Sequence, residues 1–84
     1  MFERGKVVVS LAGRDKGKLL AVMRQENGHV ILCDGKERPI DRPKSKNIRH
    51  VEATQASLTQ AELSTNRALR KALGRLSAEI NGNT

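Results

Sequence analysis

Aromatic residues are almost absent from this sequence: Phe2 stands alone, with no tryptophan and no tyrosine. Proteins that hold single strands or splayed bases usually stack those bases on aromatic side chains. The sequence therefore argues against recognition of nucleic acid by base stacking. Any binding to nucleic acid would rest on phosphate contacts and on shape.

Cysteine and long apolar runs are also scarce. Cys33 is the single cysteine, so no internal disulfide can form, and no spacing typical of a zinc site is present. No segment is long and apolar enough to cross a bilayer. The short apolar run near the N-terminus has charges on both sides, unlike a signal peptide. We expect a reduced, cytoplasmic protein with no metal, no cofactor and no membrane attachment.

Signals for catalysis are missing as well. His29 and His50 have no evident nucleophile as a partner, and Ser10 and Cys33 lie in strand-like runs, where buried structural roles are commoner. The segment "GRDKGK" (13–18) lacks the strand, loop and Lys-Ser/Thr order of a P-loop. A chain of 84 residues also buries too little surface for a roomy enclosed cavity. We predict no catalytic residues and expect a binding protein, not an enzyme.

Positive charge is what the sequence has in excess. Sixteen Lys and Arg residues against nine Asp and Glu residues give a net charge of +7. A field of this sign attracts polyanions, which means nucleic acid or an anionic membrane surface. An inert, solvated basic surface is the other interpretation. We favour nucleic acid, because large aromatic anchors for a membrane interface are lacking.

Short β-like runs and turn residues fill the first fifty positions. Runs rich in valine and isoleucine favour strands, because β-branched side chains suit a pleated surface. Pro39 confines its strand to an edge or a bulge, and 41–47 is expected to be a loop. Five short strands with frequent turns predict a small, strongly bent barrel. The expected strands are 6–11, 18–25, 29–34, 37–41 and 47–51.

The clearest turn is a hairpin at Asn27–Gly28, two residues that tolerate the positive φ of a type I′ turn. A regular register from this turn would place Val22 opposite Cys33 on one face. It would place Met23 opposite Leu32 on the other. Both faces then carry apolar residues, so the pattern leaves open which face is inside.

Helix formers dominate after residue 53. Thr59 and Glu62 fit a capping box, which predicts an amphipathic helix over 59–81. A second possible start at 64–66 also allows a short turn followed by a longer helix. Gly74 weakens the helix on its basic side; it is either tolerated there or leaves room for a phosphate backbone. We expect a barrel over 1–52, a linker over 53–58 and the helix over 59–81. Its apolar stripe comprises Leu69, Leu73, Leu76 and Ile80.

Three basic groups are candidates for contact with RNA. Glycines that bracket a charged loop can expose backbone amides beside cations, and arginine suits phosphate oxygens. The loop residues are Gly13, Arg14, Lys16, Gly17 and Lys18. The central segment offers Lys36, Arg38, Arg42, Lys44, Lys46 and Arg49. The helix offers Arg67, Arg70, Lys71 and Arg75, whose exposed face is either simply solvated or part of the contact.

The order of β-run, "GRDKGK" loop and β-run resembles the KOW motif over roughly residues 4–34. The matching positions are Gly5, Val7, Val9, Gly13, Asp15, Lys16, Gly17, Lys18 and Val22. With "RPKSKNIRH" (42–50) and "TNRALRKAL" (65–73), the chain is similar to small bacterial KOW proteins, which are related to large-subunit ribosomal proteins of archaea and eukaryotes. The resemblance implies an SH3-like barrel that binds RNA, with ribosomal RNA or the large ribosomal subunit as the expected partner.

Two other functions fit the sequence. KOW barrels also occur in transcription factors, where they contact proteins, so the chain could be a protein-interaction module. The stripe formed by Leu69, Leu73, Leu76 and Ile80 would then pair with a partner helix or with a second copy of the chain. Because so short a seam is unstable alone in water, the stripe is expected to pack on the chain's own barrel or on a partner, and the sequence leaves the choice open. Binding to duplex DNA is the other alternative, because phosphate contacts alone do not distinguish the two nucleic acids.

Overall fold

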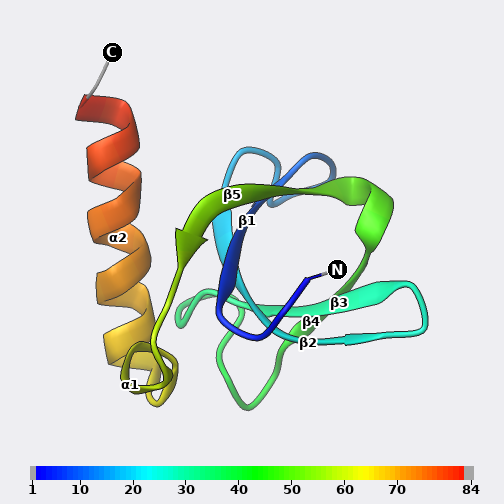
Figure 1. Ribbon diagram of the computed structural model, residues 1–84, viewed down its shortest axis with the longest axis horizontal. Coiled ribbons are helices and arrows are strands. Elements are labelled where there is room, and N and C mark those ends of the chain that lie inside the picture. Colours follow the sequence, from blue (N-terminus) through cyan, green and yellow to red (C-terminus); the bar gives the residue numbers. More distant parts are fainter. Residues whose placement is uncertain (1, 83–84) are drawn as a thin grey trace.

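The computed structural model describes residues 2–82. Its elements form one sheet followed by helices (Figure 1). In chain order they are β1 (Lys6–Ser10), β2 (Leu19–Glu26), β3 (His29–Cys33), β4 (Lys44–Asn47), the 3₁₀ turn η1 (Ile48–His50), β5 (Val51–Ser57), α1 (Gln60–Leu63) and α2 (Asn66–Gly82). The prediction of a mainly β chain with a C-terminal helix is confirmed. No helix within these residues combines the length and the apolar character needed to span a membrane.

The sheet is antiparallel, with strand order β4-β3-β2-β1-β5. It curls strongly, so that β5 arches over the ring seen in Figure 1. Its two edge strands, β4 and β5, are not hydrogen-bonded to each other in the described part of the chain. The turn η1 joins these two strands along the chain, and the sheet is not closed into a barrel by hydrogen bonds.

Both faces of the sheet are buried, which explains the apolar residues on both sides of the predicted hairpin. The cluster inside the curl comprises Val8, Leu20, Val22, Val30, Leu32 and Val51. The cluster on the outer face joins Val7, Ala21, Met23, Ile31 and Cys33 to Leu63, Leu69 and Leu73 of the helices. Neighbouring residues along β1, β2 and β3 thus feed the two clusters alternately, as the pleat requires.

The hairpin turn forms as predicted, with φ of 48° at Asn27 and 78° at Gly28. The predicted register fails after three pairs, however, because a bulge falls between Val22 and Arg24. Val22 lies opposite Leu32, not Cys33. The extra residue at the bulge, Met23, joins the outer cluster.

The fourth strand lies later in the chain than predicted. Residues 37–41 form turns, because the Asp34 carboxylate accepts hydrogen bonds from the amides of Lys36 and Arg38, at 2.8 Å each. The expected loop 41–47 instead contains β4, which pairs with β3. The residues of this strand are polar, which an edge strand tolerates because it pairs with a neighbour on one side only.

The fifth strand also lies later than predicted. Asn47 caps η1 by accepting a hydrogen bond from the amide of Arg49 at 2.9 Å, so Ile48–His50 is a 3₁₀ turn and not a strand. Residues 53–57, expected as a linker, form most of β5 and pair with β1. Their polar composition reflects an edge strand with one exposed face.

The capping box at Thr59 is confirmed: the Thr59 amide donates to Glu62 at 2.8 Å, and the Glu62 amide donates back at 3.2 Å. The helix breaks after this single turn, so the second predicted start is the correct one for the long helix. Thr65 accepts a hydrogen bond from the Ala68 amide at 3.0 Å as α2 begins. One helix over 59–81 is therefore replaced by α1 and α2.

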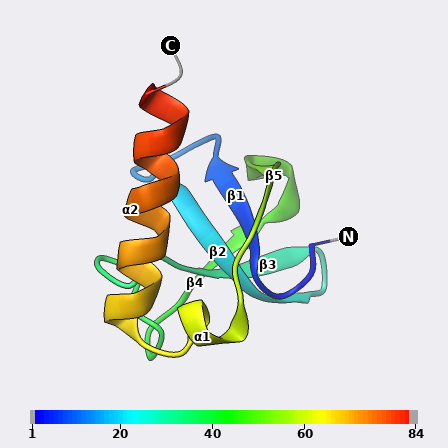
Figure 2. The same cartoon turned by 60° about the vertical axis from the view of Figure 1, so that its left-hand side comes forward.

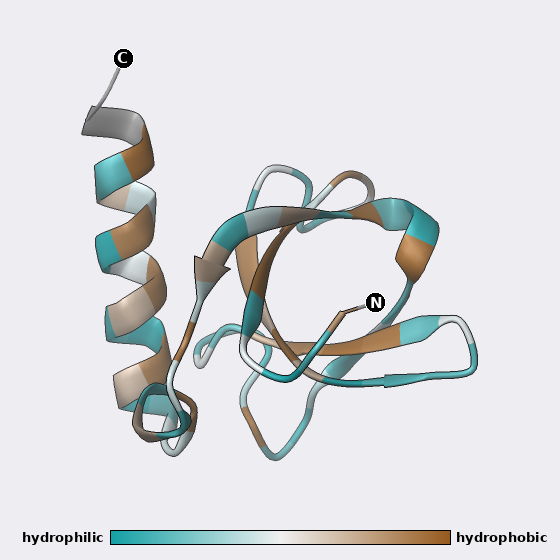
Figure 3. Cartoon of the chain, viewed as in Figure 1, coloured by the Kyte–Doolittle hydropathy of each residue, from teal (hydrophilic) through white to brown (hydrophobic). Residues whose placement is uncertain are grey.

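The long helix packs on the chain's own sheet (Figure 2). In Figure 3 the hydrophobic positions of α2 lie along the side of the ribbon nearest the strands, and Leu69 and Leu73 are buried in the outer cluster. Gly35 lies so close to the start of α2 that an added Cβ would overlap the carbonyl oxygen of Asn66. The Asn66 side chain also accepts a hydrogen bond from the Ile40 amide at 2.8 Å. These contacts tie the helix to the loop that follows β3.

Candidate nucleic-acid interface

The loop between β1 and β2 contains the glycine-bracketed segment 13–18. Gly13 and Gly17 adopt positive φ values of 78° and 85°, the conformation for which glycine is suited. The Gly17 amide donates to the Ser10 carbonyl at 2.8 Å, which closes the loop at its base. The loop thus has a defined shape, and Arg14 and Lys16 stand exposed on it.

Asp15 is the buried residue of this loop, with 4% of its surface exposed. Its carboxylate accepts a hydrogen bond from a guanidinium nitrogen of Arg38 at 3.2 Å. A buried carboxylate is tolerated when a cation compensates it. This ion pair joins the loop to the segment 34–38, which is 23 residues away in the sequence.

A second cation anchors the same loop from another side. The ammonium of Lys46 in β4 donates a hydrogen bond to the carbonyl oxygen of Ala12 at 2.8 Å. The Leu11 amide donates to the His50 carbonyl, also at 2.8 Å. Arg38 and Lys46, both predicted to contact RNA, therefore hold the loop in place. The sequence could not indicate this, because both partners are distant in the chain.

Lys18 and Glu37 form an exposed ion pair across the two segments, 2.6 Å apart, with about half of each side chain accessible. The hydrogen bond between them raises the pKa of Lys18 and lowers the pKa of Glu37. Exposed pairs of this kind contribute little stability. The Lys18 ammonium is therefore available to exchange Glu37 for another anion.

Six other cations of the loop and the central segment take part in no ion pair within residues 2–82. All are exposed except Lys44, which is half-buried. They are Arg14, Lys16, Lys36, Arg42, Lys44 and Arg49. The loop and the central segment, predicted as separate groups, are brought together by the contacts of Asp15 and Lys46.

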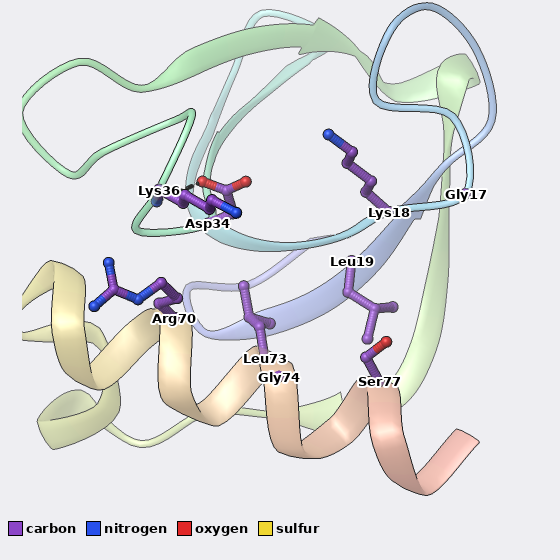
Figure 4. A pocket seen from close by; sticks show the side chains of 9 residues that line it. All are labelled: Gly17, Lys18, Leu19, Asp34, Lys36, Arg70, Leu73, Gly74 and Ser77. Atoms are coloured by element: carbon purple, nitrogen blue, oxygen red, sulfur yellow. Dashed lines mark hydrogen bonds between the residues drawn. The ribbon is translucent and has the colours of Figure 1, made fainter. Parts of the chain in front are cut away.

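The helix cations are divided between two sides of α2. Arg70 lines a groove of about 370 Å³ together with Lys18 and Lys36 (Figure 4). Lys71 and Arg75 line a different groove, between the two helices. There Arg75 pairs with Glu62 at 3.0 Å, and the backbone hydrogen bond from Thr59 lowers the pKa of Glu62.

Arg67, the remaining helix cation of the predicted set, is exposed near the start of α2. Only Arg70 among the four thus borders the same space as the two basic segments. The groove it borders was not predicted, because its lining comes from three separate segments of the chain. The lining residues are Gly17, Lys18, Leu19, Asp34, Lys36, Arg70, Leu73, Gly74 and Ser77. Gly74, which also lines the groove, was the one residue whose local context in the sequence suggested a contact on this side of the helix.

The apolar stripe of α2, predicted as a possible protein contact, lies partly in the core. Leu69 is fully buried and Leu73 is 6% exposed, both against the chain's own sheet. Leu76 and the 52% exposed Ile80 border a groove of about 310 Å³ beside β5. A protein contact through this stripe would be confined to that end of the helix.

Cys33 lies in the outer cluster, where burial raises its pKa to about 11. Its thiol approaches the Pro39 carbonyl at 3.6 Å and is fully buried. Over residues 2–82, His, Cys, Asp and Glu side chains form no group of three or more that could hold a metal ion. Neither the protein-family models nor the curated proteins gave a match to this chain.

Proposed function

We propose that this chain is a KOW-type RNA-binding module that associates with the ribosome through structured RNA. Under this proposal the curled sheet is an SH3-like barrel, and the 13–18 loop is its KOW loop. The resemblance over residues 4–34 supports the family. The five-stranded sheet with a basic loop between its first two strands is consistent with it.

One observation carries the proposal: the loop and the central basic segment are fastened together. The pair between Asp15 and Arg38 and the hydrogen bond from Lys46 to Ala12 fix one against the other. Exposed cations on a fixed frame lose little conformational entropy when they bind. Such a frame suits a polyanion whose phosphates are regularly spaced.

Phosphate is the part of the RNA that these residues would contact. Arg14, Lys16 and Lys36 offer charged donors, and the arginine fork matches phosphate oxygens. No aromatic side chain is available for base stacking apart from Phe2, which packs against the inner cluster. Contacts of this kind recognise the shape of structured RNA and its backbone.

The proposal is tested by the salt dependence of binding to a labelled RNA duplex. Neutralisation of about six phosphates gives a slope of about −5 for log K against log salt. Changing Arg14→Gln and Lys16→Gln together should weaken binding and reduce the steepness of that slope by about 2. A slope equal to that of the unchanged protein would remove the loop from the interface.

A matched control removes the same charge elsewhere. Arg24 and Arg75 are exposed and pair with Glu26 and Glu62, away from the loop. Changing Arg24→Gln and Arg75→Gln together should alter the slope far less than the loop variant does. Competition with a DNA duplex of equal length distinguishes the two nucleic acids: equal competition would favour the DNA alternative.

A further inference from the structure

The groove between α2 and the two basic segments is open to solvent and has a volume of about 370 Å³. We propose that it receives the sugar-phosphate backbone of the bound RNA, so that α2 forms one wall of the RNA site. This inference rests on the proposed function. It assigns to the helix a binding role in addition to its packing on the sheet.

Three cations from separate parts of the chain border the groove: Lys18, Lys36 and Arg70 (Figure 4). Asp34 is the one acid that lines it, and an oxygen of its carboxylate is already engaged by the amides of Lys36 and Arg38. The charge of the lining therefore favours an anion. Since Lys18 also belongs to the basic loop, the groove continues the surface proposed to bind phosphates.

Gly74 also supports close approach of an RNA backbone to this side of α2. A Cβ at this position would meet no heavy atom within 4 Å, and its φ is not positive, so neither packing nor backbone conformation requires glycine. Glycine within a helix is destabilising. It lies one turn after Arg70 and almost one turn before Ser77, on the side of α2 that lines the groove. A residue without a side chain here lets an RNA backbone approach the helix closely.

The chemistry of the lining favours a polymer backbone over a small cofactor. Small-molecule sites enclose most of their ligand, whereas this groove is largely open to solvent. Its lining contains no aromatic residue for a base. Cations combined with the hydroxyl of Ser77 suit phosphate and ribose oxygens.

The test fills the groove without removing charge. Gly74→Gln should keep or raise the thermal midpoint, because glutamine is a better helix former. It should nevertheless weaken binding to a labelled RNA duplex about tenfold, comparable to the loss of one charge-assisted hydrogen bond. Ala78→Gln, an exposed position outside the groove lining, is the matched control and should bind like the unchanged protein.

A second pair of variants tests the charge. Arg70→Gln should weaken binding and reduce the steepness of the salt slope by about 1. Lys71→Gln removes the same charge at the next residue, which lines the other groove, and should leave the slope nearly unchanged. If Gly74→Gln proves poorly folded, the comparison of Arg70 with Lys71 decides alone.

The outcomes separate this inference from the proposed function. If the Arg14 and Lys16 variant loses binding while Gly74→Gln and Arg70→Gln bind normally, the RNA function stands and the groove is excluded. Equal losses in the Ala78 and Lys71 controls would also overturn the groove. Absence of RNA binding in the unchanged protein would remove both proposals.

Discussion

At the scale of single residues, charge and role separate within the 13–18 loop. Asp15 is an acid in a basic loop, so a count of charges places it among residues that oppose RNA. Its burial and its pair with Arg38 make it the residue that fixes the loop's position. Conversely, Lys46 is a cation, but its ammonium donates a hydrogen bond to the Ala12 carbonyl within the fold. Geometry, not sign, decides what each of these side chains contributes.

This distinction predicts an effect opposite to simple electrostatics. Asp15→Asn raises the net charge by one, yet it should weaken RNA binding several-fold, because Arg38 loses its anion and the loop loses its anchor. The free energy of unfolding should fall by about 2 kcal/mol, less than for a fully buried pair, because Arg38 is partly exposed. Fluorescence anisotropy and urea unfolding measure the two effects.

The control for this variant is Asp41→Asn, at an exposed acid in the turn before β4. It makes the same change in charge and should leave RNA affinity unchanged or slightly higher. Tighter binding by Asp15→Asn than by the unchanged protein would mean that the loop's shape is irrelevant to binding.

The residue scale also marks what the sequence could predict of the site. The positive φ values at Gly13, Gly17 and Asn27 were predictable, because they follow from local turn chemistry. The anchoring roles of Arg38 and Lys46 were not, because their partners lie 23 and 34 residues away. Local composition identifies a basic surface but not which cations remain free on it.

At the scale of elements, the strands and helices that are specified by residues within one segment were predicted correctly. Those that depend on pairing with a neighbouring strand were misplaced. The first three strands and the capped helix start were predictable from β-branched runs, a type I′ turn and a capping box. β4 and β5 were misplaced, because edge strands of polar residues gain their order from pairing with β3 and β1. The bulge near Met23 was hidden for the same reason, since a bulge is a property of two strands together.

The packing of α2 is tested by two truncations on the same apolar stripe. Leu69→Ala should lower the free energy of unfolding by about 3 kcal/mol, because Leu69 is fully buried in the outer cluster. Ile80→Ala should cost about 0.5 kcal/mol or less, since 52% of Ile80 is exposed. Urea unfolding followed by circular dichroism measures both. Equal costs would contradict the placement of α2 on the sheet.

At the scale of the whole molecule, a single sheet serves two cores. Residues of β1, β2 and β3 point alternately into the curl and toward the helices, so the inner and outer clusters share their backbone. The sequence showed apolar residues on both faces of the hairpin but did not show which cluster each would join. The curl and the helix that cover the two faces form only in the complete fold. The two clusters should therefore unfold together.

The free energy of unfolding at alkaline pH tests whether Cys33 is buried in the outer cluster. Burial raises the pKa of Cys33 from 9.0 to about 11, so the folded state keeps this proton in a range where the unfolded chain releases it. The resulting stability is fully present below pH 9 and is lost as the pH rises toward 11. The loss should amount to about 2 to 3 kcal/mol.

Comparison with Cys33→Ala isolates this contribution, because lysines titrate alike in both proteins. The variant should be less stable at neutral pH, since it leaves a small cavity, but its unfolding free energy should decline less steeply between pH 9 and 11. Urea unfolding at several pH values gives the two slopes. Parallel slopes would mean that the thiol does not stay protonated in the folded state.

The close approach of Gly35 to the Asn66 carbonyl bears on how this sequence can evolve. Exposed cations whose side chains form no ion pair within residues 2–82, such as Arg14 and Lys16, can be exchanged or moved without disturbing the packing. The position of Gly35 has no such freedom, because any side chain would push α2 away from the sheet. Descendants of this chain that change their ligand should therefore retain a glycine shortly after the third strand, and this glycine would trace their ancestry after the cations had ceased to do so.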